Sequence, residues 1–447
     1  MSGVAPGPDD ALSRVEKELL ARWPESRIEW KLERMTALMH ALGDPHLAYP
    51  VLHIAGTNGK TSTSRMADAL LRALDLRTGR YTSPHLESIT ERISIDGEPL
   101  SAQAFVDTYD DVTPFFDLVD AGSDVRLSFF EAVTGMAFAA FAEAPVDIAV
   151  VEVGMGGRLD ATNIVPAPVA VITPIDLDHM VHLGDTIAAI AAEKAGIIKA
   201  DQTVVIAVQH PEAMQVLLHK AADQGATVAR EGTEFGVVAR EIGVGGQLLR
   251  LQGLHATYDD VFLPLYGAHQ ASNAACALAA VEAMVGRQGP LDPDLVRAGF
   301  ASVRSPGRLE VVRSSPTILI DATHNPAGAR VTVETLAEAF AFRRLVGVFA
   351  ALGDKDVHTM LEIFEPFLAH IVVTENSSIR SMRVDDLAAM AVEIFGEDRV
   401  DVASRLDEAI GTAVERAEED SDFGGAGVLV TGSVVTAGEA RAMLRRS

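Results

Sequence analysis

The chain has 447 residues, a formal net charge of −26 and 22% charged residues. This length exceeds what one compact core usually holds, so we expect two domains or a little more. The acidic balance argues against a nucleic-acid partner, because phosphate contacts need clustered Lys and Arg, and no apolar run approaches the roughly 18 residues that a membrane helix needs.

Cysteine content and the first residues indicate where the protein works. Cys276 is the single cysteine of the sequence and cannot form an internal disulfide. The first ten residues have neither the basic start nor the apolar stretch of a secretory signal. A reducing compartment suits both features, so we expect a cytoplasmic protein.

Apolar runs and helical patterns alternate along the first half of the chain. Residues 11–48 predict one or two amphipathic helices. Short apolar runs of the length typical of buried parallel strands then occur at 51–54, 147–153, 169–173 and 203–208. Helical patterns lie between them, at 61–74, 101–119, 129–143 and 185–198. This alternation predicts a mainly parallel α/β sheet with helices on both faces.

The pattern of apolar and polar residues changes after residue 228. Short strand-like pieces split by glycine over 228–263 predict an antiparallel excursion, and a helix is expected at 270–285. A second alternating series begins near residue 303, with strands expected at 317–321, 345–350, 370–374 and 427–431. We therefore expect a P-loop-type domain over residues 1–300, followed by a smaller Rossmann-like α/β domain over residues 301–447.

Residues 54–62, IAGTNGKTS, lie between a predicted strand and a predicted helix. In this arrangement backbone N–H groups and the helix N-terminus face a phosphate, Lys60 adds a charge, and Thr61 or Ser62 can reach Mg²⁺. Ile54 stands where the first glycine of the usual P-loop would be, and Gly56 comes two residues late. The pattern favours nucleotide binding over a helix-capping turn that carries an incidental lysine.

Acidic and basic residues follow the next two predicted strands. Glu152 ends one strand, where a carboxylate can hold Mg²⁺ opposite a phosphate loop, although it could instead cap the next turn. Asp176, Asp178 and His179 follow the next strand, and Lys194 lies on the helix beyond it. Their convergence on one sheet edge favours a site over solvated or structural roles.

The C-terminal part offers a second group of polar residues. A turn over 305–310 presents Arg308, which can neutralise phosphate charge. Asp321 ends a strand and could accept a hydrogen bond from a ribose or adenine donor. Read alone, these are a surface arginine and a strand-end turn; with the phosphate loop, they predict a reaction in a cleft between two domains.

Ten ordered strings from about residue 50 to 441 make the chain recognisable: HIAGTNGKTS, GRYTSPHL, SFFEAVT, VVEVGMGGRLDATN, ITPIDLDHMVHLG, EKAGIIK, HQASNAACAL, SPGRLE, DATHNPAGA and TGSVVTAGEAR. The chain resembles the folylpolyglutamate synthase/dihydrofolate synthase family of the Mur ligase superfamily. The resemblance implies that ATP activates a pterin-linked carboxylate as an acyl phosphate, which the amine of L-glutamate then attacks to form an amide. Dihydropteroate or reduced folates would be the acceptors.

The resemblance also implies roles for individual residues. The ATP contacts it implies are Gly56, Thr57, Asn58, Gly59, Lys60, Thr61, Ser62, Asn273, Arg308, Asp321 and His324. The Mg²⁺ ligands would be Ser83, Glu152 and His179, and Lys194 matches a lysine that family members carry as a carbamate. Lys60, Glu152, His179, Lys194 and Arg308 form the implied catalytic set. The pterin-side pocket would be lined by Thr82, Ser128, Phe130, Met155, Gly156, Gly157 and Arg158, with help from residues 29–35.

Two departures and several alternatives stay open. Thr61 follows Lys60 where many relatives have glycine, so either loop hydroxyl could meet Mg²⁺, and Ser128 stands where threonine is common. We expect a monomer with both activities; one activity alone is an alternative. A Mur-type ligase for a peptidoglycan precursor is another, disfavoured because only some fifty residues precede the phosphate loop. A third is a non-catalytic nucleotide-binding protein.

Overall fold

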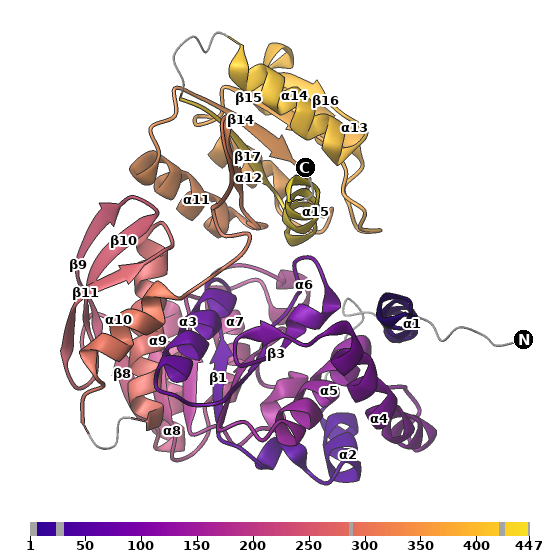
Figure 1. Cartoon of the computed structure of the whole chain (residues 1–447), viewed down its shortest axis with the longest axis vertical. Helices are drawn as coiled ribbons and strands as arrows, with labels where there is room; N and C mark the ends of the chain where they lie inside the picture. The colour runs from indigo at the N-terminus through magenta and orange to yellow at the C-terminus, as the bar shows by residue number, and fades with distance from the viewer. Residues whose placement is uncertain (1–6, 24–30, 286–288, 420–424, 446–447) are drawn as a thin grey trace, which may run out of the picture.

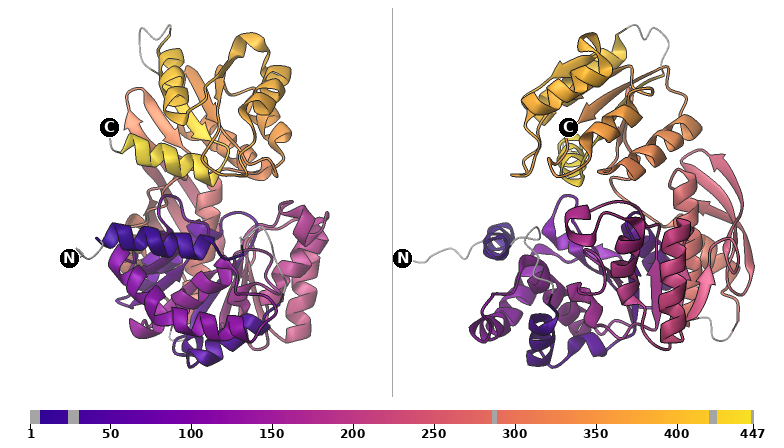
Figure 2. Two further views of the ribbon diagram at one scale, coloured as in Figure 1. Left: turned by 90° about the vertical axis from the view of Figure 1, so that its right-hand side faces the viewer. Right: turned by 180° about the vertical axis from the view of Figure 1, so that it is seen from behind.

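The computed structural model describes residues 7–23, 31–285, 289–419 and 425–445. The N-terminal part of the chain forms the lower body in Figure 1, and the C-terminal part forms the upper body. Each body has its own sheet with helices packed against it (Figure 2). The predicted α/β class with mainly parallel sheets is confirmed.

An eight-stranded sheet forms the lower body, in the order β4-β3-β2-β5-β1-β6-β7-β8. Six strands run parallel, and β3 and β4 are antiparallel at one edge. The strands are β1 Val51–Ala55, β2 Thr78–Tyr81, β3 Ile93–Ile95, β4 Glu98–Pro99, β5 Ile148–Glu152, β6 Val169–Ile172, β7 Thr203–Ile206 and β8 Thr227–Arg230. Every residue of β1, β5 and β6 is buried, as expected of parallel strands with helices on both faces.

Alternate residues of these strands face two different apolar clusters. Leu52 and Ile54 join the cluster with α3 and α9, whereas Val51 joins the one with α4 and α5. The helices of this part are α1 Pro8–Leu20, α2 Glu33–Ala41, α3 Lys60–Ala73, α4 Ala102–Ala121, α5 Phe129–Glu143, α6 Met180–Leu183, α7 Ile187–Lys194, α8 Pro211–Gln224, α9 Ala268–Val285 and α10 Pro293–Ala301. Within the described ranges, no helix is long and apolar enough to cross a membrane.

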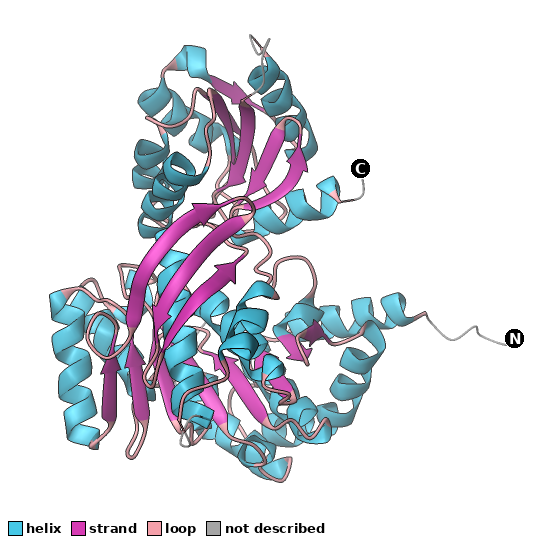
Figure 3. Cartoon of the chain, turned by 60° about the vertical axis from the view of Figure 1, so that its left-hand side comes forward, coloured by secondary structure: helices cyan, strands magenta, loops and turns pink. Residues whose placement is uncertain are grey.

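Three antiparallel strands form a separate small sheet: β9 Gly236–Gly243, β10 Gly246–Gln252 and β11 Thr257–Leu263. They confirm the predicted antiparallel excursion except at its start, because residues 228–230 belong to the parallel strand β8. Figure 3 shows these strands beside the large sheet, reaching toward the C-terminal body.

A six-stranded sheet forms the upper body, in the order β12-β13-β17-β14-β15-β16, with only the edge strand β12 antiparallel among its described strands. The strands are β12 Glu310–Ser314, β13 Thr317–Ile320, β14 Arg344–Phe349, β15 His370–Val373, β16 Val400–Val402 and β17 Ala426–Thr431. The helices are α11 Pro326–Ala339, α12 Val357–Phe364, α13 Val384–Phe395, α14 Leu406–Glu418 and α15 Val434–Leu444. Their apolar faces cover both sides of the sheet.

Two other local predictions differ from the structure. The helix expected over 185–198 ends at Lys194, and a 3-10 turn follows over Ala195–Ile197. Strand β2 was missed because its sequence, Thr-Gly-Arg-Tyr, has no apolar run. Its residues are nevertheless buried: Arg80 pairs with Asp68 at 2.9 Å, and Gly79 lies against a phenylalanine ring that a Cβ atom would strike.

Candidate active site

The loop between β1 and α3 is shaped by two glycines that approach other segments closely. A Cβ atom at Gly56 would lie 1.8 Å from Thr173 Oγ1, and one at Gly59 would lie 2.5 Å from Asn273 Oδ1. Gly59 has a φ of 89°, in the left-handed region, and as the N-cap of α3 it has no side chain to cover the first-turn amides. The loop thus presents a helix N-terminus with room for an anion.

Two lysines meet at one backbone carbonyl of this loop. Lys60 Nζ donates to Gly56 O at 3.1 Å, and Lys194 Nζ donates to the same oxygen at 2.8 Å. Lys194 is 5% exposed. Burial, reinforced by the charge of Lys60, lowers the pKa of Lys194 to about 7. Burial therefore favours the neutral, nucleophilic form of this amine.

Glu152 lies at the carboxyl end of β5, directly opposite the start of α3. Its carboxylate accepts a hydrogen bond from Thr61 Oγ1, at 3.1 and 3.0 Å to its two oxygens. The residue is 1% exposed. Burial raises its pKa to about 7, although Lys60, Thr61 and Arg308 act to lower it. A cation at this position would favour the ionised carboxylate.

Asp178 joins the two bodies at the centre of the site. Its Oδ1 lies 2.7 Å from Lys355 Nζ, and its Oδ2 lies 3.3 Å from Asn325 Nδ2 and 3.7 Å from His324 Nε2. Burial acts to raise the pKa of Asp178, but contact with His324 and the charge of Lys355 hold that pKa well below its usual range. His179 follows it as the N-cap of α6, and burial lowers the pKa of that imidazole to about 4.

The turn over residues 305–310 is held by carboxylates on both sides of Arg308. Gly307 N donates to Glu310 Oε2 at 2.8 Å, and Leu309 N donates to Asp321 Oδ2 at 2.9 Å. The other oxygen of Asp321 accepts from Thr323 N at 3.0 Å. Asp321 therefore fixes the turn that presents Arg308.

Two adjoining cavities occupy the space between the bodies. The larger cavity, of about 670 Å³, is lined by the phosphate loop and by residues of both bodies. The smaller cavity, of about 300 Å³, has a mainly apolar wall. The two share the wall residues Ser83, Pro84, Gly154, Met155, His179, His324 and Val434.

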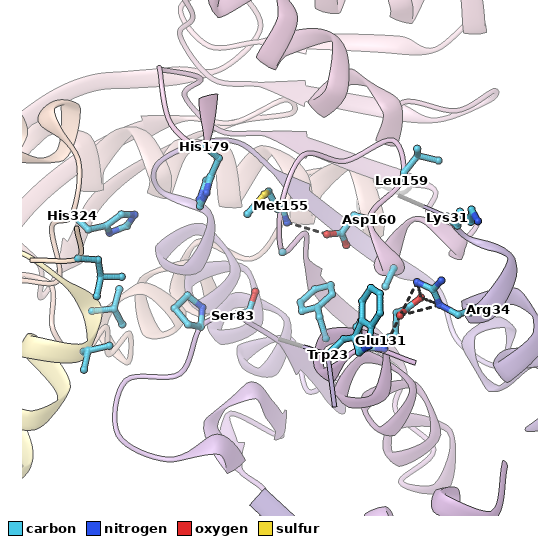
Figure 4. A pocket seen from close by; sticks show the side chains of 18 of the residues that line it. Trp23, Lys31, Arg34, Ser83, Glu131, Met155, Leu159, Asp160, His179 and His324 are labelled. Carbon is cyan, nitrogen blue, oxygen red and sulfur yellow. Dashed lines mark hydrogen bonds and ion pairs between the residues drawn. The ribbon is translucent and has the colours of Figure 1, made fainter. Parts of the chain in front are cut away.

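The smaller cavity has two chemically different ends (Figure 4). His179 and His324 lie at the end next to the larger cavity. Trp23 and the ion pair of Arg34 with Glu131, 3.1 Å apart, lie at the other end. A flat, largely apolar molecule could therefore fill the smaller cavity and present a polar group to the phosphate loop.

The structure gathers most of the predicted site residues around these cavities. The predicted residues that line the larger cavity are Gly56, Thr57, Asn58, Gly59, Lys60, Thr61, Ser62, Ser83, Glu152, Met155, Gly156, His179, Lys194, Asn273, Arg308, Asp321 and His324. Ser128 and Phe130 line the smaller cavity. Of the segment 29–35, residues 29 and 30 lie outside the described residues, and Lys31 and Arg34 line the smaller cavity.

Three predicted pocket residues line neither cavity among the described residues: Thr82, Gly157 and Arg158. Thr82 N donates to Arg92 O at 3.0 Å in the sheet edge. A Cβ atom at Gly157 would lie 2.8 Å from the carbonyl oxygen of Glu193, and Arg158 pairs with the Glu193 side chain at 2.9 Å. These two residues therefore hold the loop after β5 against the end of α7.

Sequence reasoning missed part of the site. Lys355 follows β14 and contacts Asp178 from the other body, and Trp23 and Asp160 line the smaller cavity. Asp160 Oδ2 accepts from Met155 N at 2.9 Å, which fixes the loop between the cavities. The signal available for Lys355 was the string Gly-Asp-Lys-Asp over residues 353–356, shortly after a predicted strand. No pattern in the sequence pointed to Trp23.

Comparisons with known protein families and with curated proteins both find Mur-type ligases. Residues 54–281 match the Mur ligase middle domain family, and residues 307–434 match the Mur ligase glutamate ligase domain family. The Mycobacterium tuberculosis dihydrofolate synthase/folylpolyglutamate synthase is 54% identical over all of this chain and 96% of its own length.

Solved structures give the same result. The Mycobacterium tuberculosis folylpolyglutamate synthase complexed with ADP superimposes with a TM-score of 0.95 at 54% identity, over 99% of this chain and 100% of that one. The Escherichia coli enzyme FolC in complex with DHPP and ADP superimposes with a TM-score of 0.84 at 30% identity, over 99% of both chains.

Proposed function

This chain belongs to the dihydrofolate synthase/folylpolyglutamate synthase family of Mur ligases, and we propose that it adds L-glutamate to dihydropteroate and to reduced folates. It is an ATP-dependent ligase. The observation that carries the substrate proposal is the shared wall of the two cavities, which joins the phosphate-loop cavity to a mainly apolar one.

ATP occupies the larger cavity in this proposal. The first-turn amides of α3 and the Lys60 ammonium face its phosphates, and Arg308 approaches from the other body. Asn273, Asp321 and His324 line the same cavity and would lie near the nucleoside. Relatives bound to ADP support this use of the cavity.

The pterin acceptor occupies the smaller cavity, with its ring near Phe130 and its carboxylate toward His179 and Ser83. A carboxylate oxygen attacks the γ-phosphorus of ATP, and the bond between that phosphorus and the ADP oxygen breaks. Charge spreads over the transferred phosphoryl group, and Lys60 and Arg308 stabilise it. The product is an acyl phosphate held at the junction of the cavities.

The glutamate amine then attacks the carbonyl carbon of the acyl phosphate. The new C–N bond forms, the C–O bond to phosphate breaks with its electron pair, and the ammonium proton leaves to solvent. The amide, ADP and inorganic phosphate result. Closure between the two bodies excludes water, which would otherwise hydrolyse the acyl phosphate.

The residues present fit a magnesium ion. No group of three His, Cys, Asp or Glu side chains gathers for a metal in the part of the chain that the structure describes. Magnesium commonly takes one or two carboxylates plus substrate phosphates and water, so Glu152 would hold it, with Ser83 and His179 in the wall of the same cavity. When bound, the ion would neutralise phosphate charge.

Lys194 fits the carbamate that the family resemblance implies. The reaction with CO₂ needs a neutral amine, and burial lowers the pKa of Lys194 to about 7. Its Nζ lies 2.8 Å from Gly56 O, at the phosphate loop. A carbamate there would turn a cation beside Lys60 into an anion.

The wider organisation follows from the same features. We propose an ATP-binding domain over residues 1–300 and a glutamate-ligase domain over 301–447, because each part has its own sheet. We propose a monomer. The single cysteine, Cys276, is buried and free, which supports a cytoplasmic enzyme.

The test is ATP-dependent incorporation of labelled glutamate, with Mg²⁺ and bicarbonate, using dihydropteroate and tetrahydrofolate in separate assays. We expect incorporation with both acceptors and release of one ADP for each amide. Incorporation with only one acceptor would show that the enzyme has only one of the two activities, dihydrofolate synthase or folylpolyglutamate synthase. Failure with both acceptors would refute it.

A further inference from the structure

One segment of the N-terminal body crosses to the C-terminal body. Residues 83–88, here called the docking segment, begin at Ser83 in the wall of both cavities. Glu91 organises the segment, because its carboxylate accepts from the backbone N–H groups of Leu86, Glu87 and Ser88, each at 3.0 Å. The Leu86 side chain packs against the apolar cluster formed by β13, β17 and α15 of the C-terminal body.

Helix α15 receives the docking segment at a glycine. A Cβ atom at Gly438 would lie 1.8 Å from the carbonyl oxygen of Leu86 and 2.8 Å from its carbonyl carbon. Both are backbone atoms, so any side chain at 438 would displace the segment. Figure 1 shows α15 on the side of the C-terminal body that faces the N-terminal body.

Arg441, one turn further along α15, contacts both bodies. Its guanidinium pairs with Glu87 of the docking segment and donates from Nε to Glu310 Oε2 at 2.7 Å. Only 12% of the Arg441 side chain is exposed. Glu310 Oε2 in turn accepts from Gly307 N at 2.8 Å, beside Arg308.

These contacts form one continuous chain of interactions between two walls of the larger cavity. Ser83 stands at one end, three residues before Leu86, and Arg308 stands at the other, next to Gly307. The segment TGSVVTAGEAR, which ends at Arg441, contains both the glycine and the arginine. Arg441 itself lines neither cavity among the described residues.

We propose that Arg441 is a positioning residue: it fixes the docking segment relative to the turn that presents Arg308, so that Ser83 and Arg308 keep their relative places in the wall of the larger cavity. This inference rests on the proposed ligase function. Misplacing reacting groups by about 1 Å can cost on the order of a hundredfold in rate, so a residue outside the cavities can control the chemical step.

The test compares Arg441→Ala with Arg416→Ala. Arg416 is a matched control because it also pairs with two acidic residues, Asp401 and Glu419, but inside the C-terminal body. We expect Arg441→Ala to lower kcat by about tenfold to a hundredfold without raising KM for the pterin acceptor. Arg416→Ala should retain the parental kcat.

A second readout does not depend on catalysis. Hydrogen exchange at the amides of Leu86, Glu87 and Ser88 should become faster in Arg441→Ala and stay unchanged in Arg416→Ala. Glu87→Gln, which removes the negative charge from the contact between Arg441 and the docking segment, should change kcat and exchange in the same direction by a smaller amount. Arg441→Lys should recover part of kcat, because it keeps the charge but loses the forked donor geometry.

A parental kcat in Arg441→Ala, or unchanged exchange at residues 86–88, would overturn the proposal. Equal losses of kcat in Arg441→Ala and Arg416→Ala would also overturn it, since they would show a general loss of stability. If Arg441→Ala fails to fold, Glu87→Gln and Arg441→Lys decide the question. If the parental chain ligates no glutamate, the proposed function fails, and the exchange measurement still tests the contact.

Discussion

The two cavities are built in different ways. One contiguous loop, residues 56–62, contributes seven wall residues to the larger cavity. Its glycines and the helix N-terminus that follows are the features typical of an anion site. Among the described residues, the smaller cavity is lined by no comparable glycine loop. Its wall collects side chains from distant segments, including Trp23, Phe130, Met155, Leu352 and Val434.

This difference predicts that the cavities can be damaged separately. Changes in the loop should impair phosphoryl transfer and leave acceptor binding intact, whereas changes in the apolar wall should do the reverse. The exception is the shared wall, where Met155 and His179 face both cavities. Variants confined to one cavity therefore measure how independent the two sites are.

The largest effect is expected from Lys60→Ala. Removing a cation that faces the developing phosphoryl charge should lower kcat by about a hundredfold to a thousandfold. The fold should persist, because the hydrogen bonds of Lys60 Nζ within the described part of the chain go to the loop carbonyls of Gly56 and Thr57. Steady-state kinetics and thermal unfolding would measure the two quantities.

Lys17→Ala is the matched control, since Lys17 is exposed on α1. It should leave kcat unchanged. Turnover near the parental value in Lys60→Ala would contradict the role given to the loop. A parallel loss of acceptor binding would instead show that the two cavities are coupled.

Lys194→Ala should have the next largest effect, with a loss of about tenfold to a hundredfold in kcat. Short carboxylic acids should partly restore activity, because they can occupy the place of the carbamate. Labelled bicarbonate should give a carbamate signal in the carbon NMR spectrum of the parental protein and none in the variant. Full activity in Lys194→Ala, with no carbamate signal in the parental protein, would reject the modification.

Sequence predicts the larger cavity better because its information is local. Gly56, Lys60 and Thr61 occur within six residues, and Glu152 ends an apolar run that is readily recognised as a strand. Asp178 and Lys355 form an equally central contact, yet they are 177 residues apart. Nothing in either segment alone shows that the two side chains meet.

The same contrast between local and distant sequence information explains which strands could be predicted. Strands β1, β5, β6 and β7 are mainly apolar segments, and the structure contains all of them. Strand β2 contains Arg80, a residue that is not expected in a buried strand. Its charge is compensated by Asp68, twelve residues away on α3, and the sequence of the strand alone does not show this pairing. Gly157 and Arg158 were assigned to the acceptor pocket, but the structure places them against Glu193, which only tertiary packing could reveal.

Phe130→Ala should have the smallest effect and gives the sharpest comparison of the cavities. Its ring lines the smaller cavity, 6.0 Å from the ring of Tyr81, and lies against Gly154, where a Cβ atom would come within 2.4 Å. Loss of one stacking contact, worth about 0.5–1.5 kcal/mol, should raise KM for the pterin acceptor by roughly twofold to tenfold. Affinity for ADP, measured by calorimetry, should not change, because Phe130 is absent from the wall of the larger cavity among the described residues. Weaker ADP binding in this variant would show that Gly154, which faces both cavities, transmits the change across the shared wall, and the cavities would then be one site.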